Sequence, residues 1–448
     1  MSLKSEFDSF VDSITLKQTQ VDRIESAWTT LQKYLSSAYK LPEKHFFLQG
    51  SYANGTAVVP VPDGEYDVDV VCYCVPPQVS PENALDVLEN HLSESGNYKP
   101  RIRAKKPCVR LEYAEDAVGK FHVDVVPVRS SDDEVAYLDA PRRDEGWHAT
   151  APLEYTEWVR LQGPLFARTV KILKRWRDEQ QSVRTAVKSI VLQVLISMYM
   201  SEEEQDDLRL ARIFDQMLAD LQDLDEPPAV NNPVLPSENL TQRWSSEDFR
   251  DFVRELREAA SLSAEAVSVE DEVVAAYRWR ELLGEDFPIP RPEDVGIAQA
   301  DASHALLPGQ RGWDRQINTS IGLSISAQAR RPQRISRWKK IISGRTIVLS
   351  GYELRFTALV DNALNLDLWW QVANTGSHAQ SENGLRGEFY KAKMLNGEES
   401  PNPRVAHERA SYTGIHLVRV VAVSAGVVIA ESEWFRVAIY NRLHPVRR

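Results

Sequence analysis

Two aspartates inside an apolar run constrain the fold of this chain more than any other feature. The run YDVDVVCYCV begins at Tyr66, and within it Asp67 and Asp69 alternate with valines. Side chains of a β-strand alternate between the two faces of a sheet, so Val68 and Val70 point into a core while both carboxylates share the opposite face. The run therefore predicts a half-buried strand that carries two carboxylates side by side.

A third carboxylate and a small polar turn accompany this strand. Asp124 lies in a later apolar run, FHVDVVPV, and Gly50 and Ser51 end the run HFFLQGS before the first aspartate pair. Clustered carboxylates repel one another unless divalent cations neutralise them, so we expect two magnesium or manganese ions held by Asp67, Asp69 and Asp124. Such ions activate an attacking hydroxyl and stabilise a leaving pyrophosphate, while Gly50 and Ser51 suit phosphate oxygens. The pattern therefore predicts nucleotidyl transfer.

Changes of hydrophobic periodicity divide the chain into four parts and predict an α+β fold. A helix with Ile24, Leu31 and Leu35 on its apolar face opens the first part, which is otherwise rich in short β-runs. We expect an α/β core with this N-terminal helix over residues 1–160, a helical lobe over 161–285, a proline-containing and then basic linker over 286–344, and an all-β sandwich over 345–448. Ten acidic residues between positions 202 and 226 indicate a solvated helix face.

The charge balance and the apolar runs exclude several classes of protein. The formal net charge of −12 disfavours a general polynucleotide coat protein. No run approaches the roughly 18 apolar residues of a membrane helix, and the first residues lack the layout of a signal peptide, so we expect a cytoplasmic protein without membrane insertion. Residues 311–345 carry nine basic side chains and one acid. We interpret this segment as an exposed connector or intersubunit contact, with polynucleotide binding as the alternative.

The motifs of the first 285 residues resemble those of polymerase-β-type nucleotidyltransferases, and among them the CD-NTases, bacterial relatives of cyclic GMP-AMP synthase and oligoadenylate synthase. QGSYANGTAVVP, EYDVDVV and HVDVVPV carry the resemblance. It implies a triphosphate-binding lysine at Lys171 or Lys174 in VKILKRWRD, and a base or ribose contact at Ser189 in VKSIVLQVL. The segment NNPVLPSENLTQRW resembles the family's Asp-Pro-x-x-x-x-x-Asn segment, which implies a substrate contact at Asn239 and places Asn232 where an aspartate is common.

The resemblance implies a metal-dependent enzyme that joins nucleoside or deoxynucleoside triphosphates into a cyclic or linear oligonucleotide second messenger and releases pyrophosphate. By family analogy the product acts on a separately encoded effector protein, membrane-associated or not, in bacterial antiphage defence, and a homo-oligomeric synthetase is compatible with it. Two alternatives stay open. One is the transfer of nucleotides to tRNA or protein, with residues 311–345 as the tRNA-binding surface, and the other is a non-catalytic nucleotide sensor.

The C-terminal β region resembles the sensor-type domain that follows some bacterial members of this family. The cues are LSGYELRF, LWWQVANTG and SEWFRVAIY, with Ser424-Ala425-Gly426 as a hairpin turn. Trp369 and Trp370 are adjacent and must face opposite sides of a strand. We expect core packing for at least two of Trp369, Trp370 and Trp434, and the exposed member of the adjacent pair is the candidate for stacking on a nucleobase.

Overall fold

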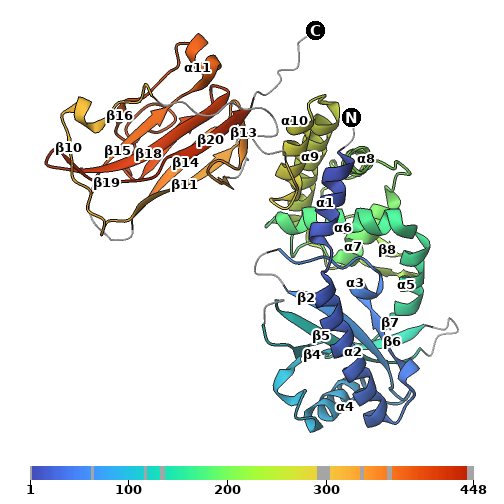
Figure 1. Cartoon of the computed structure of the whole chain (residues 1–448). Helices are drawn as coiled ribbons and strands as arrows, with labels where there is room; N and C mark the ends of the chain where they lie inside the picture. Colours follow the sequence, from blue (N-terminus) through green and yellow to red (C-terminus); the bar gives the residue numbers. More distant parts are fainter. Residues whose placement is uncertain are drawn as a thin grey trace. The chain divides into compact units, whose positions relative to one another are not determined.

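The protein forms two compact units, Met1–Ile289 and Pro290–Arg448 (Figure 1). The computed structural model describes residues 3–61, 65–115, 119–131, 137–289, 303–332, 338–360 and 366–440. Among these residues we find no helix with the length and apolar character needed to cross a membrane.

A mixed sheet forms the first half of the N-terminal unit, and its strand order is β1-β2-β5-β4-β3. Its strands are β1 (Phe46–Gln49), β2 (Tyr66–Tyr73), β3 (Ile102–Ala104), β4 (Val109–Glu112) and β5 (Phe121–Ser130), and the hairpin of β6 (Leu138–Arg142) and β7 (Gly146–Thr150) extends from β5. Strands β2 and β5 are parallel, whereas the other neighbours in this order are antiparallel. Val68 and Val70 are fully buried, whereas Asp67 is exposed and Asp69 is partly buried, so the predicted alternation of β2 is confirmed.

Helices cover the apolar face of this sheet. Helix α2 (Gln18–Tyr39) buries the predicted face with Ile24, and α4 (Pro81–Glu94) buries Leu88 in the same core as the sheet valines. Ser80 caps α4 by accepting a hydrogen bond from the backbone N–H of Asn83, because the first N–H groups of a helix lack partners within it. The carboxylate face of β2 is therefore left free of this core.

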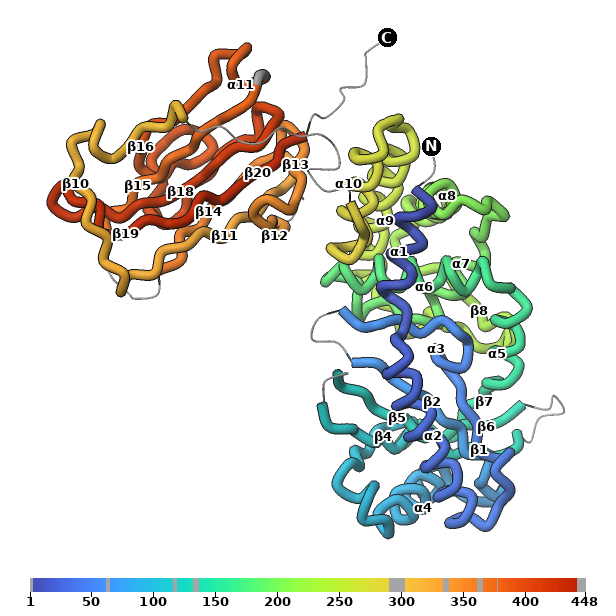
Figure 2. Tube along the Cα trace, in the orientation of Figure 1, coloured from blue at the N-terminus to red at the C-terminus, as the bar shows by residue number. Residues whose placement is uncertain are grey.

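A lobe of helices forms the second half of the N-terminal unit. It contains α5 (Pro152–Leu161), α6 (Gly163–Glu179), α7 (Ser189–Met198), α8 (Asp206–Leu221), α9 (Ser246–Ser268) and α10 (Glu272–Leu283), with the small hairpin of β8 (Asn231–Asn232) and β9 (Leu235–Asn239). The first helix of the chain, α1 (Lys4–Ile14), packs on this lobe beside α6 rather than on the α/β core (Figure 2). The ring of Phe7 lies 5.2 Å from that of Trp279 and 5.0 Å from that of Phe287, between centroids.

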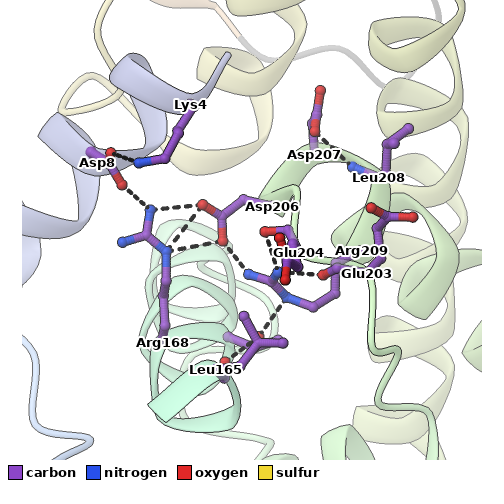
Figure 3. Close-up of polar contacts among 11 residues, drawn as sticks. Lys4, Asp8, Leu165, Arg168, Glu203, Glu204, Asp206, Asp207, Leu208 and Arg209 are labelled. Atoms are coloured by element: carbon purple, nitrogen blue, oxygen red, sulfur yellow. Dashed lines mark hydrogen bonds and ion pairs between the residues drawn. The ribbon is translucent and has the colours of Figure 1, made fainter. Parts of the chain in front are cut away.

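An ion network fixes α1 to α6 and α8 (Figure 3). Arg168 of α6 contacts Asp8 of α1 at 2.9 Å and Asp206 of α8 at 2.7 Å. Arg209, which is fully buried, also pairs with Asp206. The acidic stretch of residues 202–226 is therefore not only a solvated helix face, because one of its carboxylates holds two arginines inside the lobe.

Two facing sheets form the C-terminal unit. The larger contains β10 (Asp314–Arg315), β13 (Ile347–Leu349), β15 (Asp367–Ala373), β16 (Phe389–Tyr390), β18 (Gly414–Ser424), β19 (Val427–Glu431) and β20 (Phe435–Tyr440), and the smaller contains β11 (Leu323–Arg330), β12 (Lys339–Ile341), β14 (Glu353–Val360) and β17 (Val405–Arg409). Phe356 and Phe435, from opposite sheets, meet edge to face with centroids 6.0 Å apart. Ala425 and Gly426 both have positive φ, as a tight turn between β18 and β19 requires. A short helix, α11 (Gly376–Ser381), interrupts a region predicted as strands alone.

The structure differs from the linker predicted over residues 286–344. Strand β11 pairs with β14 along its whole length, and β10 and β12 also belong to the sandwich. Two of its basic residues have acidic partners there, since Arg315 pairs with Glu431 and Arg330 with Glu353. The linker prediction was wrong here for two reasons. The small and polar residues of LSISAQAR give only a weak strand pattern, and the excess of basic residues around them suggested an exposed connector. Residues 290–302 and 333–337 of the predicted linker lie outside the described residues.

Candidate active site

A cavity of about 290 Å³ lies between the sheet and the helical lobe of the N-terminal unit. The sheet half lines it with Gln49, Gly50, Ser51, Asn54, Asp67, Asp69 and Thr150, and the helical half lines it with residues that include Tyr155, Lys174, Ser189, Gln193, Asn232 and Glu238. Six of the nine predicted site residues therefore lie at one cavity. These are Gly50, Ser51, Asp67, Asp69, Lys174 and Ser189.

Gly50 lies where only a residue without a side chain fits. Antiparallel pairing puts Gln49 of β1 opposite Asp69 of β2, so the next residue begins the short helix α3 (Gly50–Ala53) directly beside the Asp69 carboxylate. A Cβ atom on Gly50 would lie 2.1 Å from Oδ2 of Asp69, and the backbone there has a φ of +72°. A glycine at this position lets the chain approach the carboxylate closely and takes up the left-handed conformation at little cost.

Asp124 lies beside the pair but is bound to an arginine. Asp124 lies on β5, between two neighbouring strands. It is paired with Asp69 of β2 on one side and with Arg110 of β4 on the other. Nε and Nη2 of Arg110 donate to the two carboxylate oxygens of Asp124, both at 2.8 Å. Within the described ranges no three His, Cys, Asp or Glu side chains are close enough together to hold a metal ion. The three-carboxylate cage expected from the sequence is therefore not closed in this structure.

Opposite charges face each other across the cavity. Burial and the neighbouring Asp67 and Asp124 raise the pKa of Asp69 well above its usual range, because its charged form is poorly solvated and repelled. Burial also lowers the pKa of Lys174 to about 8, and the two carboxylates of β2 oppose that shift. A divalent cation would stabilise the ionised form of Asp69 and relieve its repulsion from Asp67, so the carboxylate oxygens of this pair fit such an ion.

Lys174 and Ser189 are held in place by the loop and helix around them. Nζ of Lys174 donates to the backbone oxygen of Thr56 at 3.0 Å, and Oγ of Ser189 accepts from Nη1 of Arg177 at 3.0 Å. Both residues, with Ser51 and Asp67, also line an adjoining cavity of about 110 Å³. Polar groups from both lobes therefore converge on a continuous site.

Lys171 and Asn239, which the resemblance implied as substrate contacts, do not line either cavity. Lys171 lies one turn before Lys174 and reaches Oγ1 of Thr15 at 3.5 Å. Oδ1 of Asn239 accepts from the backbone N–H of Thr241 at 3.0 Å. In that segment Asn232 lines the cavity instead.

Sequence reasoning missed Arg110 and a chain of polar contacts across the cavity wall. The hydroxyl of Tyr155 donates to Oε1 of Gln193 at 3.2 Å, and Nε2 of Gln193 donates to Oγ1 of Thr56 at 3.3 Å. A polar residue in the middle of SIVLQVLISM was a usable signal, because a buried amide needs partners. Arg110 alternates with apolar neighbours in its strand, so its register could have suggested it only once the strand order was known.

Comparison with known protein families assigns each of the two units to a domain family. Residues 1–162 match the Second Messenger Oligonucleotide or Dinucleotide Synthetase domain, and residues 305–440 match the Adenylyl/Guanylyl and SMODS C-terminal sensor domain. The chain belongs to the CD-NTase family. This CD-NTase therefore carries a nucleotidyltransferase unit and a sensor domain.

Curated relatives and a solved structure agree with this assignment. A cyclic AMP-AMP-AMP synthase of Acinetobacter sp. is 26% identical over 306 residues, which cover 64% of this chain and 86% of the relative. A c-di-GMP synthase of Roseivirga ehrenbergii is 23% identical over 315 residues, covering 61% and 82%. The structure of E. coli MS115-1 CdnC with ATP has a TM-score of 0.53 at 17% identity and covers 64% of this chain and 99% of that one, which shows a shared fold.

The tryptophan pair of the sensor domain does not form a free stacking platform. Trp370 is fully buried and belongs to the core of the sandwich. Trp369 is half-buried, and its ring carries Arg311 at 4.3 Å and Lys391 at 4.0 Å from the centroid. Trp434 lies under Arg419 at 4.5 Å. Because cations already lie against these rings, the stacking candidate at Trp369 is not supported by the geometry.

Proposed function

We propose that this CD-NTase joins nucleoside triphosphates into a cyclic oligonucleotide second messenger and releases one pyrophosphate with each bond. The observation that carries the proposal is the placement of Asp67 and Asp69 beside Lys174 in one cavity of the synthetase unit. The names of both curated relatives describe makers of cyclic products, which favours a cyclic product over a linear one.

The side chains of the cavity suit each part of this reaction. The acceptor hydroxyl oxygen forms a bond to the α-phosphorus, the bond from that phosphorus to the bridging oxygen breaks, and the hydroxyl proton passes to solvent. Lys174 supplies positive charge near the phosphates, and the Ser51 hydroxyl donates to a phosphate oxygen. Ser189 would contact the base or ribose.

Asp67 and Asp69 would hold magnesium or manganese ions, which supply charge neutralisation when bound. Asp124 would join them through lone pairs that its bidentate contact with Arg110 leaves available. By family analogy, the product acts on a separately encoded effector in antiphage defence.

Transfer to tRNA has less support from the arrangement of charges. The alternative relied on residues 311–345 as a basic surface, and there Arg315 and Arg330 are paired with acids while Arg311 lies against Trp369. A polyanion would have to compete with these internal contacts.

The experiment that tests the proposal is product analysis. The purified chain is incubated with each labelled ribonucleotide and deoxyribonucleotide triphosphate and magnesium or manganese, then treated with phosphatase, and the products are identified by mass spectrometry. We expect small phosphatase-resistant products from the wild type and a loss of at least about 100-fold for Asp67→Asn and Asp69→Asn, because the charge that binds the cations is removed. Asp12→Asn, at an exposed position, is the matched control.

Each other result would contradict a part of the proposal. Phosphatase-sensitive products mean linear chains, and label on added tRNA or on protein means macromolecular transfer. Wild-type activity in Asp67→Asn means that the cation assignment is wrong.

A further inference from the structure

The active-site cavity of about 290 Å³ has polar residues beyond those that suit cations and phosphates. The residues that it shares with the adjoining cavity mark the end where the two meet, and they are Ser51, Asp67, Lys174 and Ser189. Polar residues of the helical lobe that line only the larger cavity include Tyr155, Gln193, Asn232 and Glu238. A nucleotide with its phosphates at the shared end would therefore present its base or ribose to this second group.

Two side chains of the second group are held by each other. The hydroxyl of Tyr155 donates to Oε1 of Gln193 at 3.2 Å, and Nε2 of Gln193 donates to Oγ1 of Thr56 at 3.3 Å. Burial raises the pKa of Tyr155 and the nearby charge of Glu238 adds to the shift, so the phenol keeps the proton that it donates. Both side chains are buried and already bonded.

The carboxylate of Glu238, on β9, is the accessible acceptor of this group. Its Oε2 accepts from Nδ2 of Asn232 at 2.8 Å, and Oδ1 of Asn232 accepts from the backbone N–H of Val234 at 3.1 Å. Asn232 is buried, whereas Glu238 is partly exposed. No donor in the described part of the chain reaches Oε1 of Glu238, and a carboxylate offers about four lone-pair sites. The carboxylate is therefore fixed by Asn232 and can still accept two hydrogen bonds.

The four bases differ in what their edges offer to a fixed carboxylate. Guanine has two adjacent donors, N1–H and the N2 amino group, which match the two oxygens of a carboxylate. Adenine and cytosine place an amino donor beside a ring nitrogen that accepts, and uracil places its N–H between two carbonyl oxygens. An acceptor that faces another acceptor loses the hydrogen bond that it makes with water, which costs free energy. A carboxylate at this position therefore favours guanine.

We infer that Glu238 selects guanine and that this cavity takes up GTP. Oε1 and Oε2 of Glu238 accept from N1–H and the N2 amino group of the base, while Asn232 keeps its contact through the second lone pair of Oε2. The inference rests on the proposed function, because it places the phosphates of the same nucleotide at the end with Lys174.

The binding of nucleotides that cannot react tests the inference without turnover. The α,β-methylene triphosphates of guanosine, inosine and adenosine keep the charge of the triphosphate, but their carbon bridge blocks the release of pyrophosphate. Isothermal titration calorimetry of the full-length chain with magnesium measures their affinities. We expect the guanosine analogue to bind at least about tenfold more tightly than the adenosine analogue and than the inosine analogue, which lacks the N2 amino group. Equal affinities for all three would overturn the inference.

Glu238→Gln replaces one acceptor with a donor at little change in shape. If the remaining oxygen still accepts from Asn232, the new amide N–H faces N1–H of guanine, so the affinity for the guanosine analogue should fall at least about tenfold. The affinity for the adenosine analogue should stay the same or rise, which also reports that the variant is folded. Glu202→Gln, at an exposed position of the same lobe, is the matched control and should change neither affinity.

The outcomes separate this inference from the proposed function. Equal losses of affinity for the guanosine and adenosine analogues in Glu238→Gln would mean that the carboxylate binds the ribose or only supports the hairpin. Unchanged selectivity in this variant would mean that the carboxylate does not contact the base. Either result overturns the selection of guanine and leaves nucleotide binding intact. A wild type that binds none of the three analogues would contradict the proposed function, and this inference with it.

Discussion

At the scale of single residues, Gly50 is the position where the backbone and the chemistry depend on each other most directly. Alanine at Gly50 and alanine at Gly55 impose the same conformational cost, about 1 kcal/mol, because φ is +72° at one and +67° at the other. Only at Gly50 does the new Cβ meet Asp69, at 2.1 Å, whereas Gly55 has nothing within 4 Å. We therefore expect Gly50→Ala to lower the rate of product formation at least tenfold and Gly55→Ala to leave it near that of the wild type.

Rates at saturating triphosphate, with urea unfolding of both variants, measure this difference. Equal losses of activity in the two variants would mean that backbone strain, and not displacement of the Asp69 carboxylate, limits the reaction.

The placements that the sequence predicted correctly are those that follow from strand periodicity. Asp67 and Asp69 share a face because β2 alternates, and this requires no knowledge of the neighbouring strands. The contact between Arg110 and Asp124 depends on the pairing of β4 with β5, which no local pattern encodes. Lys171 and Lys174 are one turn apart, and which of them faces the cavity depends on how α6 packs.

At the scale of elements, the network around Asp206 attaches α1 to the helical lobe. Removal of one partner from a buried ion pair leaves the other charge uncompensated, and Arg209 is fully buried. We expect Asp206→Asn to lower the free energy of unfolding by about 3 kcal/mol. Asp207→Asn is the matched control, because this adjacent carboxyl is buried to the same extent and accepts from the backbone N–H of Leu208, a contact that asparagine keeps, so we expect a much smaller loss of stability.

Urea unfolding followed by tryptophan fluorescence measures both values. If Asp206→Asn and Asp207→Asn lower the free energy of unfolding equally, the ion network contributes little to stability. The loss would then come only from changing a buried carboxyl at the start of α8.

The elements that the sequence misplaced are those whose structure depends on partners far away in the chain. Helix α1 is amphipathic, but its partners Trp279 and Phe287 lie at the far end of the unit's sequence, so only the tertiary structure assigns it to the helical lobe. Strand β11 has small residues on its inward face, Ala327 and Ala329, and basic residues dominate its surroundings. Its pairing with β14 decides its structure, in agreement with the dependence of β-propensity on context.

At the scale of the whole molecule, the two compact units should unfold in separate transitions with different responses to acid. Burial lowers the pKa of His416 in the C-terminal unit, and burial lowers that of His407 as well. The unfolded chain takes up protons at these histidines from about pH 6.5 downward, while the folded unit resists protonation. The stability that they contribute is therefore complete above about pH 6.5 and is lost as the pH falls below it.

Scanning calorimetry at about pH 7.5 and pH 5.5 measures this response, since a histidine at about pH 6.5 titrates between the two. ATP with magnesium should raise the transition of the nucleotide-binding unit, so the transition that it leaves unchanged identifies the sensor domain. We expect that transition to fall by a few degrees at the lower pH, and to fall less in His416→Gln, because the glutamine amide accepts and donates as the neutral ring does but takes up no proton. An unchanged transition in the wild type would mean that the folded unit admits the protons, and the neutral state assigned to His416, with its partners Thr375 and Tyr412, would be wrong.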